Sequence, residues 1–176
     1  MNTVYLDYNA TAPVHPRVIE AVSACLAETG NPSSVHAAGR RARSLMETAR
    51  EIVARTVNCL PRQVVWTSGG TEANALVLRG APAAHVFVSS VEHDSVLANA
   101  PGATRLPVDA NGVIDLDALS AQLAAVEGRK LVSVMLANNE TGVIQPIAGV
   151  AERCRAGGAW LHVDAVQALG RVPVDV

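Results

Sequence analysis

Residues 159–167 read AWLHVDAVQ, a short apolar run at 159–163 that is followed by a carboxylate and, three residues later, an amide. Similar runs of apolar and β-branched residues lie earlier in the chain, at 63–67, 85–89 and 131–136. Segments with helical spacing separate most of these runs, and this alternation is typical of a mainly parallel sheet with helices on both faces. The sequence therefore predicts an α/β fold.

The pattern of the chain changes twice along its length. A turn-rich N-terminal segment covers residues 1–15, and a helical region with a long amphipathic helix over about 35–57 covers residues 16–60. Charged side chains line the outer face of that helix, and we expect most of them to be solvated. The α/β pattern occupies residues 61–176.

Local signals predict where several elements begin and end. Pro16 is typical of a first helical position and predicts a helix that starts there and stops before Gly30. An Asn-Gly pair within residues 105–114 is a hairpin-type turn signal. Asp115 is a good N-cap for a helix that we expect to run through Val126.

Composition narrows the classes of protein to consider. The 176 residues, 49% hydrophobic, suit one globular core, and the net charge of −2 argues against nucleic acid or an anionic membrane as the main partner. We find no signal peptide, no run near the roughly 20 apolar residues that span a bilayer, and no metal-ligand spacing among three scattered cysteines. We therefore expect a cytoplasmic protein that holds no metal.

Polar residues gather where the four predicted strands end. The clusters are SGGTE at 68–72, SVEH at 90–93, NNETG at 138–142 and DAVQ at 164–167. The carboxyl ends of parallel strands meet at one edge of a sheet, and open α/β sheets bind their ligands there. We therefore expect the four clusters to form one ligand site.

The SGGTE cluster has the outline of an anion-binding loop. Gly70 and the glycine before it let the backbone approach an anion, amides at the start of a helix point towards it, and Thr71 adds a hydroxyl donor. The loop lacks the lysine of a P-loop and the GxGxxG spacing, so ATP and dinucleotides fit poorly. The alternative is that the two glycines only mark a turn.

Two titratable residues at strand ends are candidates for chemistry. His93 could act as a general acid or base and stack on an aromatic ligand, or it could simply cap a helix. Asp164 follows a run apolar enough to be buried, where a carboxylate requires a partner. A pyridinium nitrogen fits that requirement and makes its ring an electron sink. The alternative partners of Asp164 are a distant arginine or the amides of a turn.

Asn139 and Gln167 place neutral hydrogen-bonding groups at two of the same strand ends. Either side chain could hold a phenolic oxygen of the same ring. The alternative is ordinary turn formation by asparagine, which we favour for Asn138.

Several motifs together resemble one family across essentially the whole chain. In order they are YLDYNATAP (5–13), GNPSSVH (30–36), TSGGTEAN (67–74), VEH (91–93), NNETGVIQP (138–146) and HVDAVQ (162–167). The sequence resembles the cysteine desulfurases of the NifS/IscS type, within the class V aminotransferase family of fold-type I pyridoxal-phosphate enzymes. The resemblance implies the truncated core of a fold-type I transferase large domain, with residues 61–176 as the first part of the cofactor-binding α/β domain.

The resemblance also implies pyridoxal 5'-phosphate (PLP) as the cofactor and gives its contacts. Gly70 and Thr71 are expected to hold the phosphate, and His93 to stack on the ring and shuttle protons. Asp164 is expected to pair with the ring nitrogen. The residues expected to contact the ring oxygen or its surroundings are Asn139 and Gln167.

The N-terminal segment is implied to lie near the substrate. The residues concerned are Asn9, Ala10 and Thr11. Two departures from the family pattern are mild, because neither removes a side chain that the chemistry needs. Gly70 stands where the family often has alanine, and Ala12 where it often has threonine.

The implied parent reaction converts L-cysteine to L-alanine and leaves the sulfur as a persulfide on an enzyme cysteine. The sulfur then passes to an iron–sulfur scaffold or another acceptor protein, and the enzyme is expected to be a homo-oligomer. In the family, the Schiff-base lysine and the nucleophilic cysteine follow the segment that ends here at Val176. Lys130, the only lysine, precedes a predicted strand and so belongs at the opposite edge. We therefore expect an N-terminal portion that is inactive alone.

Two other functions remain compatible with the sequence. The first keeps the fold and changes the substrate, as in selenocysteine lyase or another class V enzyme. The second is a lysine-free binding or assembly module without catalysis. A lysine downstream of the aspartate strand distinguishes the enzymes from the module.

Overall fold

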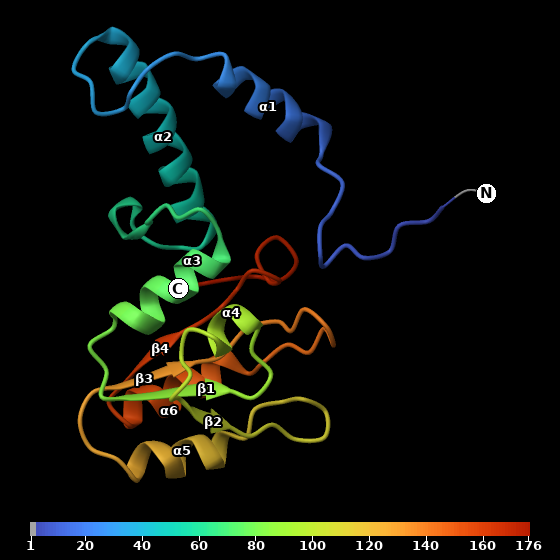
Figure 1. The fold of residues 1–176 in the computed structure, drawn as a ribbon, viewed down its shortest axis with the longest axis vertical. Coiled ribbons are helices and arrows are strands. Elements are labelled where there is room, and N and C mark those ends of the chain that lie inside the picture. Colours follow the sequence, from blue (N-terminus) through green and yellow to red (C-terminus); the bar gives the residue numbers. More distant parts are fainter. Residues whose placement is uncertain (1–2) are drawn as a thin grey trace. The chain divides into compact units, whose positions relative to one another are not determined.

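The computed structural model describes residues 3–176, which form two compact units (Figure 1). The first unit contains the chain up to Val65 together with Val174–Val176, and the second is Trp66–Pro173. The four polar clusters predicted to bind a ligand all belong to the second unit.

Helices make up the regular structure of the first unit. α1 covers Pro16–Leu26 and α2 covers Ala37–Thr56, so the two helices predicted in this region are confirmed. The side chains of His15 and His36 accept hydrogen bonds from backbone amides of the following turn and so cap α1 and α2. A short 3-10 helix, η1, follows at Pro61–Gln63.

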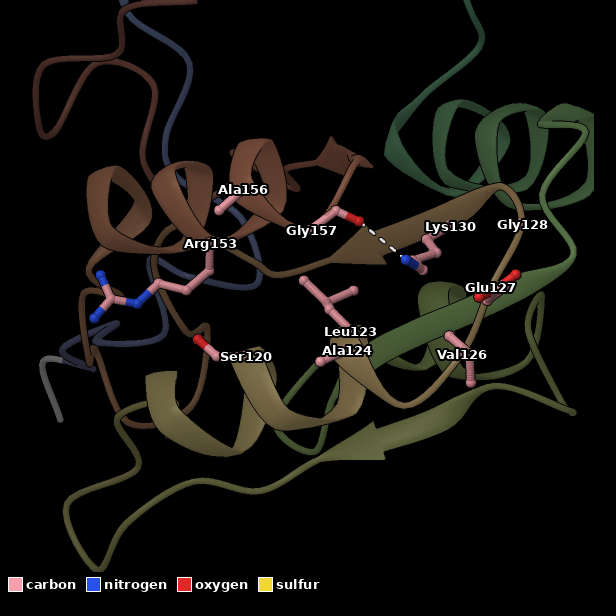
Figure 2. A pocket seen from close by; sticks show the side chains of 10 residues that line it. All are labelled: Ser120, Leu123, Ala124, Val126, Glu127, Gly128, Lys130, Arg153, Ala156 and Gly157. Atoms are coloured by element: carbon pink, nitrogen blue, oxygen red, sulfur yellow. Dashed lines mark hydrogen bonds between the residues drawn. The ribbon is translucent and has the colours of Figure 1, made fainter.

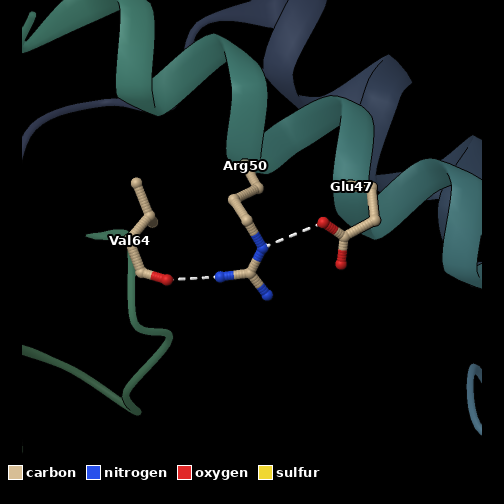
Figure 3. Close-up of polar contacts among 3 residues, drawn as sticks. All are labelled: Glu47, Arg50 and Val64. Carbon is tan, nitrogen blue, oxygen red and sulfur yellow. Dashed lines mark hydrogen bonds and ion pairs between the residues drawn. The ribbon is translucent and has the colours of Figure 1, made fainter. Parts of the chain in front are cut away.

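Arg50 departs from the solvated outer face expected for α2. Its guanidinium donates to the carboxylate of Glu47 at 3.1 Å and to the carbonyl of Val64 (Figure 3). The Arg50 side chain is only 18% exposed, so it connects α2 to the backbone that follows η1. The end of the chain also pairs within this unit, where Asn58 Nδ2 donates to Asp175 Oδ1 at 2.9 Å.

The second unit is built on a parallel sheet. Its elements are α3 (Gly70–Gly80), β1 (His85–Ser89), α4 (Asp94–Leu97), β2 (Thr104–Leu106), α5 (Leu116–Ala124), β3 (Lys130–Ser133), α6 (Ile147–Ala156) and β4 (Ala159–His162). The strands lie in the order β2-β1-β3-β4, and all three neighbouring pairs are parallel. The predicted α/β fold is confirmed, and β1, β3 and β4 are the strands expected at 85–89, 131–136 and 159–163.

Alternate residues of the central strands bury the two faces of this sheet. On one face, Phe87 and Val132 pack with side chains of α5 and α6, including Leu119. On the other face, Val88 and Leu131 pack with side chains of α3 and α4. Because successive strand residues point to opposite sides, helices cover both faces, as predicted (Figure 1).

The strand predicted at 63–67 is wrong. Pro61–Gln63 forms a 3-10 helix, and the backbone becomes extended at Val64 but joins no sheet within residues 3–176. An extended segment needs a neighbour to pair its backbone N–H and C=O groups, and β-branched composition does not supply one.

One strand was not predicted. β2 at Thr104–Leu106 pairs in parallel with β1, and the composition of this segment did not indicate a strand. The turn predicted within residues 105–114 is present, since Val108 and Ile114 form an antiparallel bridge across it. Three residues beside a well-formed strand are enough for a ladder, and the neighbour rather than local propensity decides the outcome.

The cap predicted for α5 is confirmed. Asp115 Oδ1 accepts hydrogen bonds from the amides of Asp117 and Ala118 at 3.0 and 2.9 Å. The helix ends at Ala124, two residues earlier than expected. Among the helices of residues 3–176, none has the length and apolar character needed to cross a membrane.

Replacing Leu119 by alanine is expected to destabilise the protein by about 2–5 kcal/mol, because the side chain is fully buried in the α5–α6 face and its loss leaves a cavity. Leu76→Ala is the matched control: that leucine is 57% exposed, and we expect a change below about 0.5 kcal/mol. Urea unfolding followed by circular dichroism measures both variants. Equal effects at the two positions would contradict the packing described above.

Candidate cofactor-binding site

The candidate site lies where the parallel strands end, at the side of the sheet formed by their carboxyl ends, which we call the carboxyl edge. The clusters with His93, Asn139 and Asp164 follow β1, β3 and β4, respectively, and the parallel arrangement brings these three strand ends to one edge. The SGGTE cluster at 68–72 spans the start of α3 and follows no strand, so its position does not come from a strand end.

Asp164 is the buried charge of this edge. The pairing of β3 with β4 continues beyond both strands, since the amide of Leu136 donates to the Asp164 carbonyl at 2.8 Å. The Asp164 side chain is 8% exposed, and its Oδ1 accepts from the Val166 amide at 3.0 Å while Oδ2 accepts from Asn74 Nδ2 at 2.8 Å. No ion pair within residues 3–176 includes Asp164, so the alternative of an arginine partner is not realised there.

His93 caps α4, which was one of the two roles considered for it. Its Nδ1 accepts from the Ser95 amide at 3.0 Å and lies 2.8 Å from Ser95 Oγ. The imidazole is otherwise exposed at the edge of the sheet. Capping therefore fixes the orientation of the ring and leaves its other nitrogen available for chemistry.

Two residues not singled out from the sequence connect His93 to Asp164. Asn74 Nδ2 contacts both Asp164 Oδ2 and, at 2.9 Å, Ser95 Oγ. Asn74 is 3% exposed and Ser95 is 9% exposed, so the connection is shielded from water. The sequence did contain one signal for Asn74. It lies one turn before buried Leu78, so it places a polar side chain on the apolar face of a helix.

Glu92 is a second buried carboxyl group, 6% exposed, next to His93 in the chain. Its Oε1 accepts from the Met135 amide at 2.6 Å and from Ser89 Oγ at 2.7 Å, which joins the ends of β1 and β3. Its Oε2 is buried without a hydrogen-bond partner. Burial raises the pKa of Glu92, and the negative charge of Asp164 adds a smaller increase.

A half-buried histidine, His162, is the last residue of β4. His162 Nδ1, on β4, lies 2.8 Å from Ser133 Oγ at the end of β3. Burial lowers the pKa of His162, although the nearby charge of Asp164 acts in the opposite direction. His162 therefore favours its neutral form, and its contact with Ser133 joins β4 to β3. His93, in contrast, is exposed.

The glycine loop opens onto the start of α3. Gly69 occupies the N-cap position without a side-chain cap, and a Cβ added there would meet nothing within 4 Å. Glu72 reaches back to accept from the amide and hydroxyl of Ser68, and these hydrogen bonds lower the pKa of Glu72. A Cβ at Gly70 would meet Val166 Cγ2 at 2.9 Å, so the alanine frequent in the family requires a shift of that side chain here.

The two side-chain amides predicted to contact the ring oxygen, those of Asn139 and Gln167, form hydrogen bonds with residues near them in the chain. Asn139 Nδ2 donates to Glu140 Oε1 at 2.7 Å, and Gln167 Oε1 accepts from Arg171. Asn138 forms a turn, as we favoured, because its Oδ1 accepts from the backbone amides of Glu140 and Thr141 at 2.9 and 2.8 Å.

The residues expected near the substrate belong to the first unit. The Ala10 amide lies 3.3 Å from Asp7 Oδ1 and the Thr11 amide 3.4 Å from the Asp7 carbonyl, which folds this stretch into a turn that also contains Asn9. The tyrosines on either side of Asp7 pack with ring centroids 5.7 Å apart. The predicted place of Asn9, Ala10 and Thr11 near the substrate remains a prediction.

Lys130 lies at the opposite edge of the sheet, as expected. It is the first residue of β3, and its Nζ donates to the carbonyl of Gly157 at 3.0 Å (Figure 2). Figure 2 shows this lysine beside a pocket between α5 and α6, which Arg153 and Glu127 also line. The amino ends of parallel strands are separated from the carboxyl ends by the length of the sheet, so Lys130 cannot reach Asp164.

The family model for aminotransferase class-V matches residues 4–176, and the chain belongs to this family. Among curated relatives, cysteine desulfurase IscS from Methylobacillus flagellatus is 44% identical over 189 residues, covering 98% of this chain and 46% of that protein. IscS from Dictyoglomus turgidum is 39% identical, covering 98% and 47%. The chain spans about half the length of the curated relatives it matches and corresponds to their N-terminal half.

Solved structures share the fold. A NifS-like protein from Rickettsia africae superimposes with a TM-score of 0.94 at 36% identity, covering 99% of this chain and 51% of that one. SspA, solved in complex with cysteine, gives a TM-score of 0.88 at 28% identity, covering 99% and 54%. The predicted resemblance to NifS-type enzymes and the predicted fold class are confirmed.

The raised pKa of Glu92 predicts a pH-dependent stability. A neutral Glu92 favours the folded state, so its contribution is fully present below the ordinary glutamate pKa and is lost as pH rises through the raised folded pKa. Over this window the free energy of unfolding of the wild type should fall relative to Glu92→Gln. Urea unfolding at a series of pH values measures the difference. Glu127→Gln changes an exposed glutamate and is the control, so its free energy of unfolding should change with pH as that of the wild type does. If the free energy of unfolding of Glu92→Gln also changes with pH as in the wild type, the raised pKa of Glu92 is refuted.

Proposed function

We propose that this chain is the cofactor-binding part of a PLP-dependent cysteine desulfurase. Asp164 carries the proposal, because its carboxylate is buried at the carboxyl edge of the sheet and accepts hydrogen bonds from neutral groups. A pyridinium nitrogen supplies the positive charge that offsets such burial. Membership of the class-V family and the similarity to cysteine desulfurases support the same proposal.

The glycine loop fits the phosphate end of this cofactor. The first amides of α3 have no partner within the helix, Gly69 brings no capping side chain, and the space beside it is open. Gly70 and Thr71 would then hold the phosphate through backbone amides and a hydroxyl group. The positive end of the helix dipole favours an anion at the same position.

When bound, PLP supplies an electron sink for the charge that develops at an amino-acid substrate. Asp164 would hold the proton on the ring nitrogen, and His93 would stack on the ring and take part in proton transfer. Asn139 and Gln167 would bind the ring oxygen.

We further propose L-cysteine as the substrate, with Asn9, Ala10 and Thr11 close to it. The names of the curated relatives and a neighbour solved with cysteine support this choice of substrate. The sulfur would pass to an iron–sulfur scaffold or another acceptor protein, and the active form would be a homo-oligomer in the cytoplasm. Turnover requires a lysine at the carboxyl edge, which residues 1–176 do not provide, so this chain alone is proposed to bind PLP without turning over cysteine.

Asp164→Asn tests the proposal directly, because it keeps the shape of the side chain and removes its charge. Loss of a charge-assisted hydrogen bond should weaken PLP binding roughly ten- to hundredfold. Equilibrium dialysis of the 176-residue chain against PLP measures the affinity. Asp117→Asn, an exposed aspartate on α5, should bind like the wild type. Unchanged affinity in Asp164→Asn, or no binding by the wild type, would overturn the proposal.

Borohydride reduction of the PLP-treated chain tests the place of Lys130. We expect no specific adduct at Lys130, because its ammonium group is bound to the Gly157 carbonyl at the opposite edge. Peptide mass measurement locates any adduct, and Lys130→Arg should bind PLP with the affinity of the wild type. A stoichiometric adduct at Lys130, or a loss of binding in Lys130→Arg, would show that the cofactor lies elsewhere.

A further inference from the structure

A continuous row of hydrogen bonds runs from buried Asp164 to exposed His93. Asp164 Oδ2 lies 2.8 Å from Asn74 Nδ2, which lies 2.9 Å from Ser95 Oγ, which lies 2.8 Å from His93 Nδ1. Asp164, Asn74 and Ser95 are each at least nine-tenths buried, so the two contacts among them are shielded from water. The four residues come from three separate stretches of the chain, all within the second unit.

The charge of Asp164 fixes the direction of every bond in this row. An ionised carboxylate only accepts, so Asn74 must turn its amide nitrogen towards it. The second hydrogen of that nitrogen is then donated to Ser95 Oγ. The hydroxyl hydrogen of Ser95 is left to point at His93 Nδ1, which must accept it.

A backbone contact gives the same answer independently. The Ser95 amide donates to His93 Nδ1 at 3.0 Å, and a backbone amide cannot act as an acceptor. Nδ1 therefore carries no proton, and the neutral imidazole carries its proton on Nε2.

We propose that Asn74 and Ser95 are positioning residues that transmit the charge of Asp164 to His93 and hold it as the Nε2-protonated tautomer. The use of this tautomer in catalysis rests on the function proposed above, although the tautomer itself does not. With Nδ1 engaged by Ser95, neutral His93 presents its Nε2–H as a hydrogen-bond donor.

The tautomer can be read directly by nuclear magnetic resonance of the cofactor-free chain labelled with 15N-histidine, at a pH where imidazoles are neutral. His93→Gln assigns the signals among the five histidines. In the wild type, Nδ1 of His93 should give the signal of a proton-free nitrogen and Nε2 that of a protonated one. In Ser95→Ala and in the nearly isosteric Asn74→Asp, the ratio of the Nε2-H to the Nδ1-H form should fall roughly two- to tenfold.

Two further variants separate positioning from a general effect on folding. Ser95→Thr keeps the hydroxyl group and should restore the wild-type ratio. Ser133→Ala removes the other buried serine that contacts a histidine Nδ1, so it should change the signals of His162 and leave those of His93 unchanged. Circular dichroism confirms which variants are folded.

The proposal is overturned if wild-type His93 carries its proton on Nδ1. It is also overturned if either Ser95→Ala or Asn74→Asp, once folded, keeps the wild-type ratio. Asn74→Asp keeps the volume of the side chain and replaces the donor to Ser95 Oγ by an acceptor, so it tests the proposal independently of Ser95→Ala. The measurement needs no cofactor, so a negative result leaves the proposed PLP binding intact. Conversely, failure of the wild type to bind PLP counts against the proposed function alone.

Discussion

The carboxyl edge of the sheet is organised around one buried negative charge. Removing the Asp164 carboxylate from water costs free energy, and hydrogen bonds from Val166 and Asn74 offset part of that cost. Both donors are neutral, so the local potential stays negative. This potential would favour the cationic ring nitrogen proposed above, and the proposed orientation of the hydrogen bonds to His93 depends on the same charge. One carboxylate thus sets the electrostatics at two places in the site.

Most of the fold could be predicted because burial leaves a clear pattern in the sequence. β1 and β3 are apolar runs covered on both faces, and Pro16 and Asp115 mark helix starts by chemistry that acts locally. β4 is an apolar run whose Ala159 and Leu161 pack against the core. The two errors concern pairing, which is not local. Residues 63–67 have strand composition without a pairing neighbour in the described chain, and β2 has a neighbour without strand composition.

The site was partly predictable for a related reason. Polar residues after apolar strands indicated Asp164 and His93, and the structure brings them to one edge. The residues that join them were not visible, because Asn74 lies 90 positions from Asp164 and 21 from Ser95. Only the tertiary fold makes such contacts, so periodicity in the sequence indicates a polar residue on a buried helix face without naming its partner.

The position of Lys130 has a consequence for how this domain would respond to its surroundings. A ligand held only by hydrogen bonds and charge exchanges with the free pool, and its occupancy follows concentration by mass action. A ligand that prefers the folded state also raises thermal stability as its concentration increases, by a few kcal/mol at about a hundredfold excess over Kd. With its one lysine at the far edge, the second unit of this chain would therefore report the concentration of a ligand bound at the carboxyl edge as a change in its own folding equilibrium.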